Sequence, residues 1–353
     1  MKKQAMIFIL ALLILFGTGF AIVNGWDLEA IQKRSVEADQ QVAIARLQET
    51  IQNLKLGEAL DDAAVASSAG NREAELKGYD VKEWQPKVAQ ARVEAAQAET
   101  RIAELVAQAE GMEKALNLSV ANERLNWKRQ MVDIAQRLVD MEKVRLETGM
   151  SIEANLQDAV ARLTQVEADL VTAEQEVEIA KIVLSQQLKV DISSIEPMQE
   201  MEARFPTQPE LEKWIEKDPD VIVSKVEWER AEALKTKAAE GYSVDDRVWK
   251  EKHQEALKAL LNYEEAQQNA EIAIQKNWQR AALAFKELET ALRYDKLAEL
   301  TLKNEQLKFD EGLVSEEVLL EQRGKRAEAL VSLKAAEAEY LFANIRYQIW
   351  KSQ

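Results

Sequence analysis

The sequence predicts an all-α protein, built from two repeats of long antiparallel helical hairpins with coiled-coil character. Composition is the first observation behind this prediction. The 353 residues include 11 Gly and 5 Pro, 6% are aromatic and 31% are charged, a profile typical of long helices rather than of sheets. An internal repeat is the second observation. With Gly149 set on Gly312, Leu156 falls on Leu319 and further Leu and Ala positions coincide without a gap, so one unit is used twice.

Each copy of the repeat has the same local pattern around its glycine. A helical pattern enters, the glycine interrupts it briefly, and a new Leu- and Ala-rich helical pattern leaves. Glycine adopts the backbone angles of a sharp reversal at little steric cost. The repeat is therefore predicted to be a helical hairpin whose turn lies at Gly149 in the first copy and at Gly312 in the second.

Charge and rare residue types exclude several classes of function. The formal net charge of −16 argues against nucleic acid as a main partner, because phosphate binding needs clustered Lys and Arg. The chain has no Cys and a single His, His253, which excludes disulfides, thiolate catalysis and metal sites made of several such residues. Phosphate loops, nucleophile elbows and metal-ligand spacings are also absent from the sequence. We therefore expect no catalytic, cofactor-binding or metal site and predict that the chain is not an enzyme.

Residues 1–25 are predicted as a signal peptide or an N-terminal anchor. Lys2 and Lys3 precede an uncharged run, and the small Gly25 permits cleavage before Trp26. The alternative is an uncleaved anchor, because the apolar run Ala5–Val23 is close to the ~20 residues that cross a bilayer. In both alternatives, the rest of the chain is exported and lies in the periplasm or cell envelope, outside the cytoplasmic membrane.

Residues 26–190 are predicted as the first hairpin repeat. A helical segment at 28–60 leads into a small and polar stretch at 63–84, which we expect to be a loop. The long helix follows, and the second arm of the hairpin is predicted at 151–188.

The long helix of the first repeat is predicted to run from Pro86 to about Thr148. Proline is favoured in the first turn of a helix, and only Gly111 interrupts the pattern before the turn. A lone glycine costs about 1 kcal/mol relative to alanine without ending a helix. At ~1.5 Å per residue, a helix of this length makes a rod on the order of 90 Å long, which is too long to bury itself in a compact globule.

A connector and a second repeat complete the predicted domain organisation. Residues 191–210 carry Pro197, Pro206 and Pro209 and are predicted as the connector. Residues 211–353 are predicted as the second hairpin repeat, with helical segments near 211–216, from 221, at 248–310, and from the turn at Gly312 to about 350.

Three motifs and the duplicated hairpin carry a resemblance to a known family. Along the chain, the motifs are Asp27-Leu28-Glu29-Ala30-Ile31, Asp218-Pro219-Asp220-Val221 and Phe309-Asp310-Glu311-Gly312-Leu313-Val314-Ser315. In this order, and in both repeats, the chain resembles the outer-membrane efflux channel (TolC) family over nearly its whole mature length. The resemblance implies a homotrimer of two-repeat subunits, whose helices form a tapered tunnel across the periplasm beneath a membrane β-barrel. It also implies export of small molecules together with an adaptor protein and a membrane pump.

The chain departs from the family where the barrel strands belong. The corresponding regions are 61–85 and 241–250, and neither shows the alternating apolar and polar segments of about ten residues that a membrane strand needs. A bilayer does not tolerate an open sheet. We therefore predict a TolC-like α-barrel protomer, the α-helical portion of the family, without the membrane β-barrel.

The resemblance places the two turns at the family's periplasmic helical tips, where the hairpins of an adaptor dock tip to tip. The predicted partner-docking residues are Thr148, Gly149, Met150, Ser151, Gly312, Leu313, Val314 and Ser315. Of these, Met150, Leu313 and Val314 offer apolar contact area. The alternative is an ordinary turn between helices with no partner.

An acidic residue follows each turn at the same distance, Asp158 in the first repeat and Glu321 in the second. In the family, acids on the second exit helix charge and narrow the tunnel entrance. Glu321 matches one such position, whereas Val318 occupies the other and carries no charge. Three copies of each acid would make a negative ring that favours cations. The alternative is that both acids lie on ordinary solvated helix faces.

Two functions remain open at this point. The first is an efflux or export component that forms a helical conduit in the periplasm or cell envelope, as a homotrimer working with an adaptor-type protein and a membrane pump. The second is a structural coiled-coil spacer or scaffold of the cell envelope without a lumen. A conduit needs a polar inner face that includes Asp158 and Glu321, whereas a spacer needs no second buried face.

Overall fold

The computed structural model describes residues 28–66, 70–192 and 203–351, and within these ranges every regular element is a helix. The elements are α2 (Leu28–Ala38), α3 (Gln40–Val65), α4 (Arg72–Tyr79), the π-helix η1 (Asp80–Trp84), α5 (Gln85–Glu147), α6 (Glu153–Leu188), α7 (Leu211–Ile215), α8 (Pro219–Gly241), α9 (Arg247–Asp310) and α10 (Glu316–Lys351). The predicted all-α fold class is confirmed. Residues 1–25, predicted as signal peptide or anchor, and Pro197 of the predicted connector lie outside the described residues.

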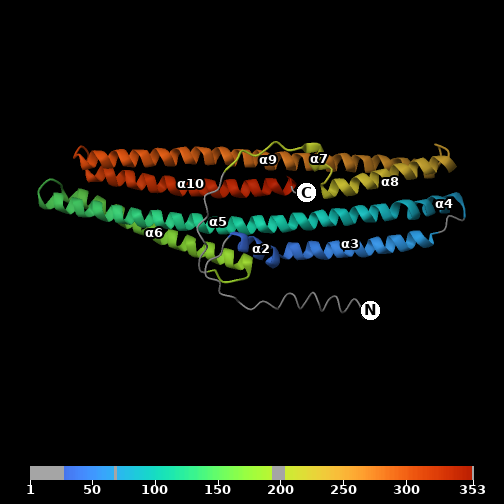
Figure 1. Cartoon of the computed structure of the whole chain (residues 1–353), viewed down its shortest axis with the longest axis horizontal. Coiled ribbons are helices and arrows are strands. Elements are labelled where there is room, and N and C mark those ends of the chain that lie inside the picture. The colour runs from blue at the N-terminus through green and yellow to red at the C-terminus, as the bar shows by residue number, and fades with distance from the viewer. Residues whose placement is uncertain (1–27, 67–69, 193–202, 352–353) are drawn as a thin grey trace.

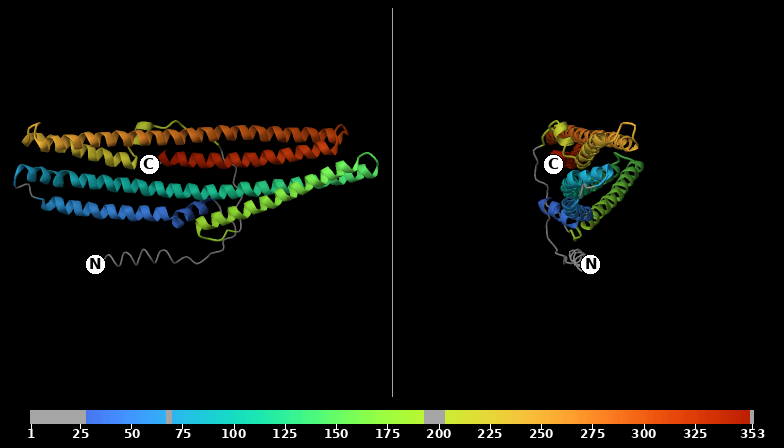
Figure 2. Two further views of the ribbon diagram at one scale, coloured as in Figure 1. Left: turned by 180° about the vertical axis from the view of Figure 1, so that it is seen from behind. Right: turned by 90° about the vertical axis from the view of Figure 1, so that its right-hand side faces the viewer.

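Two long helices form the frame of an elongated molecule (Figure 1). α5 has 63 residues and α9 has 64, so each is about 95 Å long at the usual rise per residue. Two shorter helices lie end to end along each long one, α3 and α6 along α5, and α8 and α10 along α9 (Figure 2). α8 and α10 also pack against α5. Four rods therefore follow one another across the molecule: α3 with α6, then α5, then α8 with α10, then α9.

The internal repeat of the sequence is also a repeat of structure. The offset that sets Gly149 on Gly312 sets the first residue of α6, Glu153, on the first residue of α10, Glu316. The α5–α6 turn and the α9–α10 turn lie at the same end of the molecule, which we call the tip end (Figure 1). The two hairpins thus run in the same direction, side by side.

Each hairpin has its own apolar core. In the first repeat, Leu118 of α5 packs with Leu184 and Leu188 of α6, and all three are fully buried. In the second repeat, Ile274 of α9 packs in one cluster with Tyr347 of α10. Each fully buried large side chain contributes about 1.5–3 kcal/mol to folding, so packing within the hairpins holds each pair of helices together.

A close approach at mid-length brings α2 against α5. A Cβ atom at Gly111 of α5 would lie 1.8 Å from the hydroxyl oxygen of Ser35 and 2.8 Å from the Ser35 Cβ. Ser35 and its neighbour Ile31 on α2 are both fully buried. The serine hydroxyl donates to the carbonyl of Ile31 (2.8 Å), so this buried polar group is satisfied. Only glycine fits at position 111 without moving α2.

The ends of α2 and α6 meet at this level and cap each other. Arg34 of α2 donates to the carbonyl of Leu188, the last residue of α6 (3.1 Å). Lys189, just past α6, donates to the carbonyl of Ala38, the last residue of α2 (2.6 Å). The last carbonyls of a helix lack partners within the helix and carry a partial negative charge. Arg34 and Lys189 supply the missing partners where the ends of α2 and α6 meet.

The predicted loop at 63–84 is wrong, because most of the described part of this stretch is helical. α3 continues through alanines, the residue type with the highest helix propensity, to Val65. The side chain of Asn71 then caps α4 by accepting a hydrogen bond from the N–H of Ala74 (3.0 Å). The π-helix η1 continues α4 into α5. Asp80 in η1 accepts two hydrogen bonds of 2.6 Å from Arg230 of α8, which join the repeats at the end opposite the tips.

Candidate functional site: the helical tips, the entrance acids and the outer edges

Both turns at the tip end are built from the same hydrogen bonds. The N–H of Gly149 donates to the carbonyl of Leu146 (3.0 Å), and the N–H of Met150 donates to that of Arg145 (2.8 Å). This pair of bonds is the Schellman motif, which satisfies the last carbonyls of a helix. The φ angle of Gly149 is 75°, in the left-handed region that glycine adopts without strain.

The second turn repeats this geometry. The φ angle of Gly312 is 73°. Its N–H donates to the carbonyl of Phe309 (2.9 Å), and the next N–H, that of Leu313, donates to the carbonyl of Lys308 (2.8 Å). A Cβ atom at either glycine would meet nothing within 4 Å. Glycine is thus required by backbone conformation and not by crowding.

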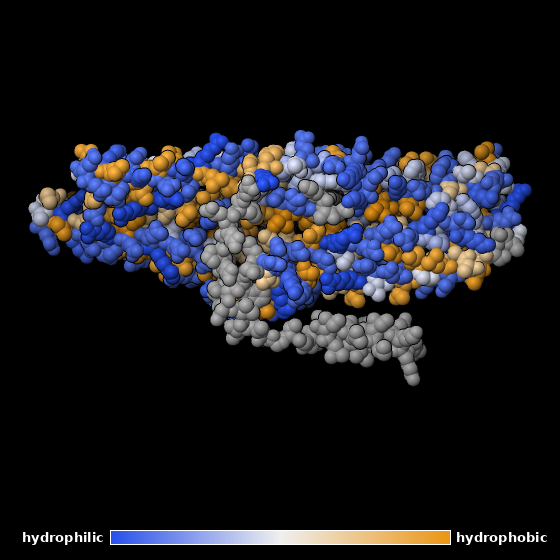
Figure 3. Space-filling view, viewed as in Figure 1, coloured by the Kyte–Doolittle hydropathy of each residue, from blue (hydrophilic) through white to orange (hydrophobic). Residues whose placement is uncertain are grey.

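The apolar side chains predicted for docking lie at the tip end, and two of the three are largely exposed. Met150 is 74% exposed and Leu313 is 70% exposed, whereas Val314 is half-buried. Ile152, at the start of α6, is also exposed, although the sequence analysis did not select it. The visible face of the molecule mixes hydrophobic and hydrophilic side chains over its whole length (Figure 3). Apolar exposure by itself therefore does not set the tips apart.

The hydroxyl groups of the residues predicted for docking form hydrogen bonds within the turns. The Thr148 hydroxyl donates to carbonyls of its own helix (2.9 and 3.1 Å). The Ser151 hydroxyl donates to the carboxylate of Glu142 (2.7 Å). Ser315 accepts a hydrogen bond from the N–H of Val318 (3.5 Å) at the start of α10. These three residues position the exposed apolar side chains.

Ion pairs tie the two repeats together near the tips. Arg137 of α5 donates two hydrogen bonds to Glu316 of α10 (2.7 and 3.2 Å), and Arg145 of α5 lies 3.5 Å from Glu317 of α10. The hydrogen bond from Arg137 lowers the pKa of Glu316. The hydrogen bond from the Ser151 hydroxyl, followed by that from Arg145, lowers the pKa of Glu142. No sequence motif indicates these ion pairs between α5 and α10, because their members are distant in sequence.

The two predicted entrance acids are each paired with a base one helical turn further on. Asp158 lies 2.8 Å from Arg162, and Glu321 lies 2.6 Å from Lys325. The four side chains are more than half exposed, and both pairs occupy equivalent positions in the repeat. The i,i+4 spacing of acid and base is a signal visible in sequence. Each predicted entrance acid therefore has a positive charge beside it on its own helix.

A small cleft of about 190 Å³ opens between α5, α6 and α10 near the tips. Asp158 and Arg162 of α6 line it together with Arg145 of α5 and Glu317 of α10. Glu321, one turn beyond Glu317 on α10, contacts Lys325. The structure thus brings Asp158 to the inter-repeat ion pairs, while Glu321 stays on its own helix.

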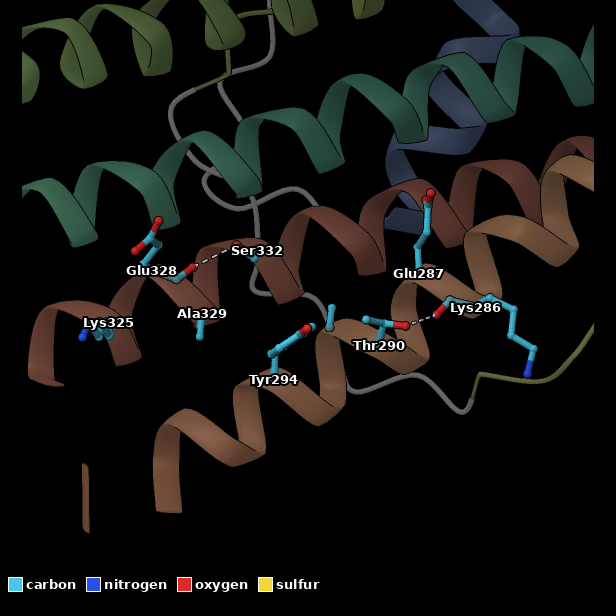
Figure 4. A pocket seen from close by; sticks show the side chains of 9 residues that line it. Lys286, Glu287, Thr290, Tyr294, Lys325, Glu328, Ala329 and Ser332 are labelled. Atoms are coloured by element: carbon cyan, nitrogen blue, oxygen red, sulfur yellow. Dashed lines mark hydrogen bonds between the residues drawn. The ribbon is translucent and has the colours of Figure 1, made fainter. Parts of the chain in front are cut away.

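A larger hollow of about 520 Å³ lies between α9 and α10 (Figure 4). It is lined by Lys286, Glu287, Thr290, Ala291, Tyr294, Lys325, Glu328, Ala329 and Ser332. The hydroxyls of Thr290 and Ser332 donate to carbonyls of their own helices (2.8 and 3.1 Å). In the first repeat, the position of Thr290 is taken by Trp127, whose Nε1 atom is buried. The hollow in the second repeat thus lies beside a position at which the first repeat has a larger residue.

Exposed large apolar side chains concentrate on the two outer rods of the molecule. On α9 they are Leu257, Leu261, Ile272, Leu283, Leu292, Tyr294, Leu297, Leu300 and Leu307. On the opposite edge they are Ile44, Leu47, Ile51, Leu54, Leu60 and Val65 of α3, and Val160, Val171, Ile179, Ile182 and Val183 of α6. The inner rod α5 has one, Val144, and none occurs among the described side chains of α8 and α10. We call the two surfaces the α9 edge and the α3/α6 edge.

α3 carries apolar residues on two faces. Val42 is buried and Leu56 is half-buried on the inward face, whereas Leu47, Ile51 and Leu54 are 51%, 44% and 63% exposed on the outward face. The exposed residues follow alternating spacings of three and four, the pattern of a coiled-coil contact. An ordinary surface helix has a single apolar face, turned toward the core, so the second apolar face of α3 indicates a partner.

Comparison with known proteins identifies the fold. The sequence matches no protein-family model and no curated protein. The structure is similar to the CmeC outer membrane channel of Campylobacter jejuni, with a TM-score of 0.66 and 14% identity over 92% of this chain and 85% of that one. It is similar to CusC, with a TM-score of 0.65 and 12% identity over 95% of both chains. For the outer membrane protein VceC of Vibrio cholerae, the TM-score is 0.63 at 12% identity over 91% and 95%.

The chain has the fold of the TolC-family channels. The resemblance inferred from the duplicated hairpin is confirmed at the level of the fold. Among the described residues, no helix has the length and apolar character to cross a membrane, and no group of acidic residues and histidines is arranged to hold a metal ion.

Proposed function

We propose that this chain assembles with two further copies into a helical tube of the cell envelope, which serves as a passive conduit for export. The observation that carries the proposal is the pair of unpartnered apolar edges. Each edge lies on an outer rod, and the two edges differ, because one belongs to a single long helix and the other to two shorter helices with different exposed residues. Two different complementary surfaces on one molecule produce head-to-tail contacts, which close into a ring when the rotation permits.

The residues of the α9 edge have the spacing of a helix face that packs against another helix. Leu261, Ile272 and Leu283 recur every eleven residues, which places them in a nearly straight line along a helix. Ala270 and Ala281, half a turn away from this line, are buried against the rest of the molecule. The line therefore faces directly outward. Burying each such residue in an interface contributes about 1.5–3 kcal/mol.

The tips give the proposed tube its direction. Both turns lie at the same end of the molecule, so three copies related by rotation would present six turns together. Met150 and Leu313 would then form a repeated apolar contact surface for an adaptor-type protein that links the tube to a membrane pump. The export of the chain beyond the cytoplasmic membrane, with residues 1–25 as signal peptide or anchor, forms part of this proposal.

The bases beside Asp158 and Glu321 change the charge that we expect at the entrance of the tube. Arg162 and Lys325 lie beside Asp158 and Glu321 and offset their negative charge. We therefore propose an entrance with weak preference for charge, in place of a cation-selective ring. Opening and closing would involve separation of helices near the turns, with no chemical step by the protein.

The proposal is tested by light scattering after size exclusion on the chain from Trp26 to Gln353. We expect a trimer. Ile272→Glu, on the α9 edge, should shift the protein to monomer, because it places a charge in the contact. Val144→Glu is the matched control: Val144 is exposed to a similar degree (58% against 64%) but lies on the inner rod α5, so this variant should remain trimeric. A monomeric parent chain would overturn the self-assembled conduit and leave the spacer function.

A further inference from the structure

The hollow between α9 and α10 differs from the matching surface of the first repeat. With Gly149 set on Gly312, each of the nine residues that line it has a counterpart in α5 or α6. Four small residues of the hollow take the place of larger ones. The pairs are Thr290 with Trp127, Ala291 with Lys128, Ala329 with Val166 and Ser332 with Asp169. Two of these four smaller residues lie on each wall of the hollow (Figure 4).

The larger residues of the first repeat contact one another. Lys128 of α5 lies 2.7 Å from Asp169 of α6, and its ammonium group lies 4.5 Å from the centroid of the Trp127 ring. Ala291 and Ser332, at the equivalent positions, carry no charge and cannot form this ion pair. The hollow thus lies where the first hairpin has an ion pair between its helices. Its volume of about 520 Å³ falls within the roughly 300–1,000 Å³ that is typical of small-molecule sites.

The charged residues around the hollow leave two carboxylates free. Glu287 of α9 and Glu328 of α10 line it, and neither carboxylate has an ion pair or a hydrogen bond with any residue that the structure describes. The two lysines of the lining are each paired with an acid outside it. The pairs are Lys286 with Glu289 (3.0 Å), which also contacts Arg293 (2.7 Å), and Lys325 with Glu321 (2.6 Å). Acids therefore outnumber bases in this group, and the hollow favours a cation over an anion.

Tyr294 gives the hollow an aromatic wall. Its side chain is 65% exposed, and it lines the hollow together with the small Ala291 and Ala329. The face of an aromatic ring attracts a cation, and a second ring stacks against it in an offset arrangement. A ligand that matches these features is flat, apolar over most of its surface and positively charged.

We propose that the hollow binds a small aromatic cation, whose ring lies against Tyr294 and whose charge is offset by Glu287 and Glu328. All nine lining residues belong to one chain, so this inference does not depend on the assembly of three copies. The first hairpin has Trp127 and the charged Lys128 at the equivalent place. One site per chain is therefore expected.

The probe for this site is N-methylquinolinium, a flat cation, and its control is quinoline, which has the same two rings and is uncharged at neutral pH. Isothermal titration calorimetry is performed on the chain from Trp26 to Gln353, which includes every residue that the structure describes. We expect one saturable site per chain for the cation and an affinity for quinoline that is about tenfold lower. Binding to Ile272→Glu, the variant expected to be monomeric, should match that of the parent chain, which separates this inference from the proposed assembly.

Three variants locate the site. Thr290→Trp installs the residue of the first repeat and should abolish binding by filling the hollow. Glu287→Gln/Glu328→Gln should lower the affinity for the cation about tenfold and leave that for quinoline unchanged. Glu299→Gln is the matched control, because Glu299 is an exposed acid of α9 outside the hollow, and this variant should bind as the parent chain does.

Two results would overturn the proposed site: no saturable binding of N-methylquinolinium to the parent chain, or unchanged binding to Thr290→Trp. Equal affinities for N-methylquinolinium and quinoline would overturn the role of the two carboxylates. Circular dichroism checks that each variant is folded. If Thr290→Trp does not fold, the affinity of Glu287→Gln/Glu328→Gln decides the question, since an unchanged affinity for the cation would also overturn the proposal.

Discussion

The close approach at Gly111 leads to a prediction with a matched control. Replacing Gly111 by alanine gains about 1 kcal/mol of helix propensity. The new Cβ would lie 1.8 Å from the Ser35 hydroxyl oxygen and 2.8 Å from the Ser35 Cβ, and overpacking of this kind costs about 1–3 kcal/mol. The Cβ of Ser35 cannot move without moving α2, so we expect the upper part of that range. The net loss for Gly111→Ala is then about 1–2 kcal/mol.

The control is Gly57→Ala in α3, where a Cβ atom meets nothing within 4 Å. It should gain up to about 1 kcal/mol from propensity alone. The free energies of unfolding are measured by urea denaturation at one protein concentration. In a Ser35→Gly background, the cost of Gly111→Ala should shrink, because the contact that causes it is gone. Equal stabilisation by Gly111→Ala and Gly57→Ala would refute the close approach of α2 and α5.

Three further predictions concern the tips and the far end of the molecule. Gly312→Ala should lower the free energy of unfolding, measured by urea denaturation, by about 1 kcal/mol, because φ is 73° and alanine is strained there. Gly312→Asn should lower it by less. Hydrogen bonds lower the pKa values of Glu142 and Glu316 below the ordinary 4.5, so their contribution to stability is complete above that pH. This contribution to stability is lost as pH falls through the lowered pKa values. We therefore expect the amides at the tips to exchange their hydrogens faster below pH 4.5. Arg230→Met should cost about 1–3 kcal/mol by leaving the largely buried carboxylate of Asp80 without its partner, whereas Arg230→Met combined with Asp80→Leu should recover part of that loss in thermal unfolding.

Much of the fold could be predicted because long helices leave clear signals in sequence. The repeat of Gly149 at Gly312 fixed the hairpins, and α5 and α10 follow the Leu and Ala spacing closely. The small and polar residues at 63–84 predict a loop, but alanine also favours helices, and most of the described part of this stretch is helical. Gly111 was interpreted as a tolerated interruption, and its cause, the crossing of α2, depends on a contact between segments far apart in the chain.

The turns that carry the candidate site could be predicted from the sequence, whereas the contacts of their side chains could be predicted only in part. The exposure of Met150 and Leu313 at the turns agrees with the sequence analysis, since apolar residues beside a turn glycine have little to pack against. The pairing of Asp158 with Arg162 could have been read from the i,i+4 spacing. The outward exposure of the α3 face could not be predicted in this way. A hydrophobic pattern shows which residues share a helix face, but it does not show whether the same chain or another chain covers that face.

The ion pairs near the tips have a mechanical consequence for the proposed tube. Arg137 and Arg145 tie α5 to α10 inside each chain. On the two outer edges, which meet between copies in the proposed tube, the repeat counterparts of Arg137 and Glu316 are Leu300 of α9 and Glu153 of α6. These two residues cannot form an ion pair. Each chain would then move as one rigid body near the tips, and the tube would open at the three interfaces between chains. Spin labels across the tips should therefore separate between chains before they separate within one.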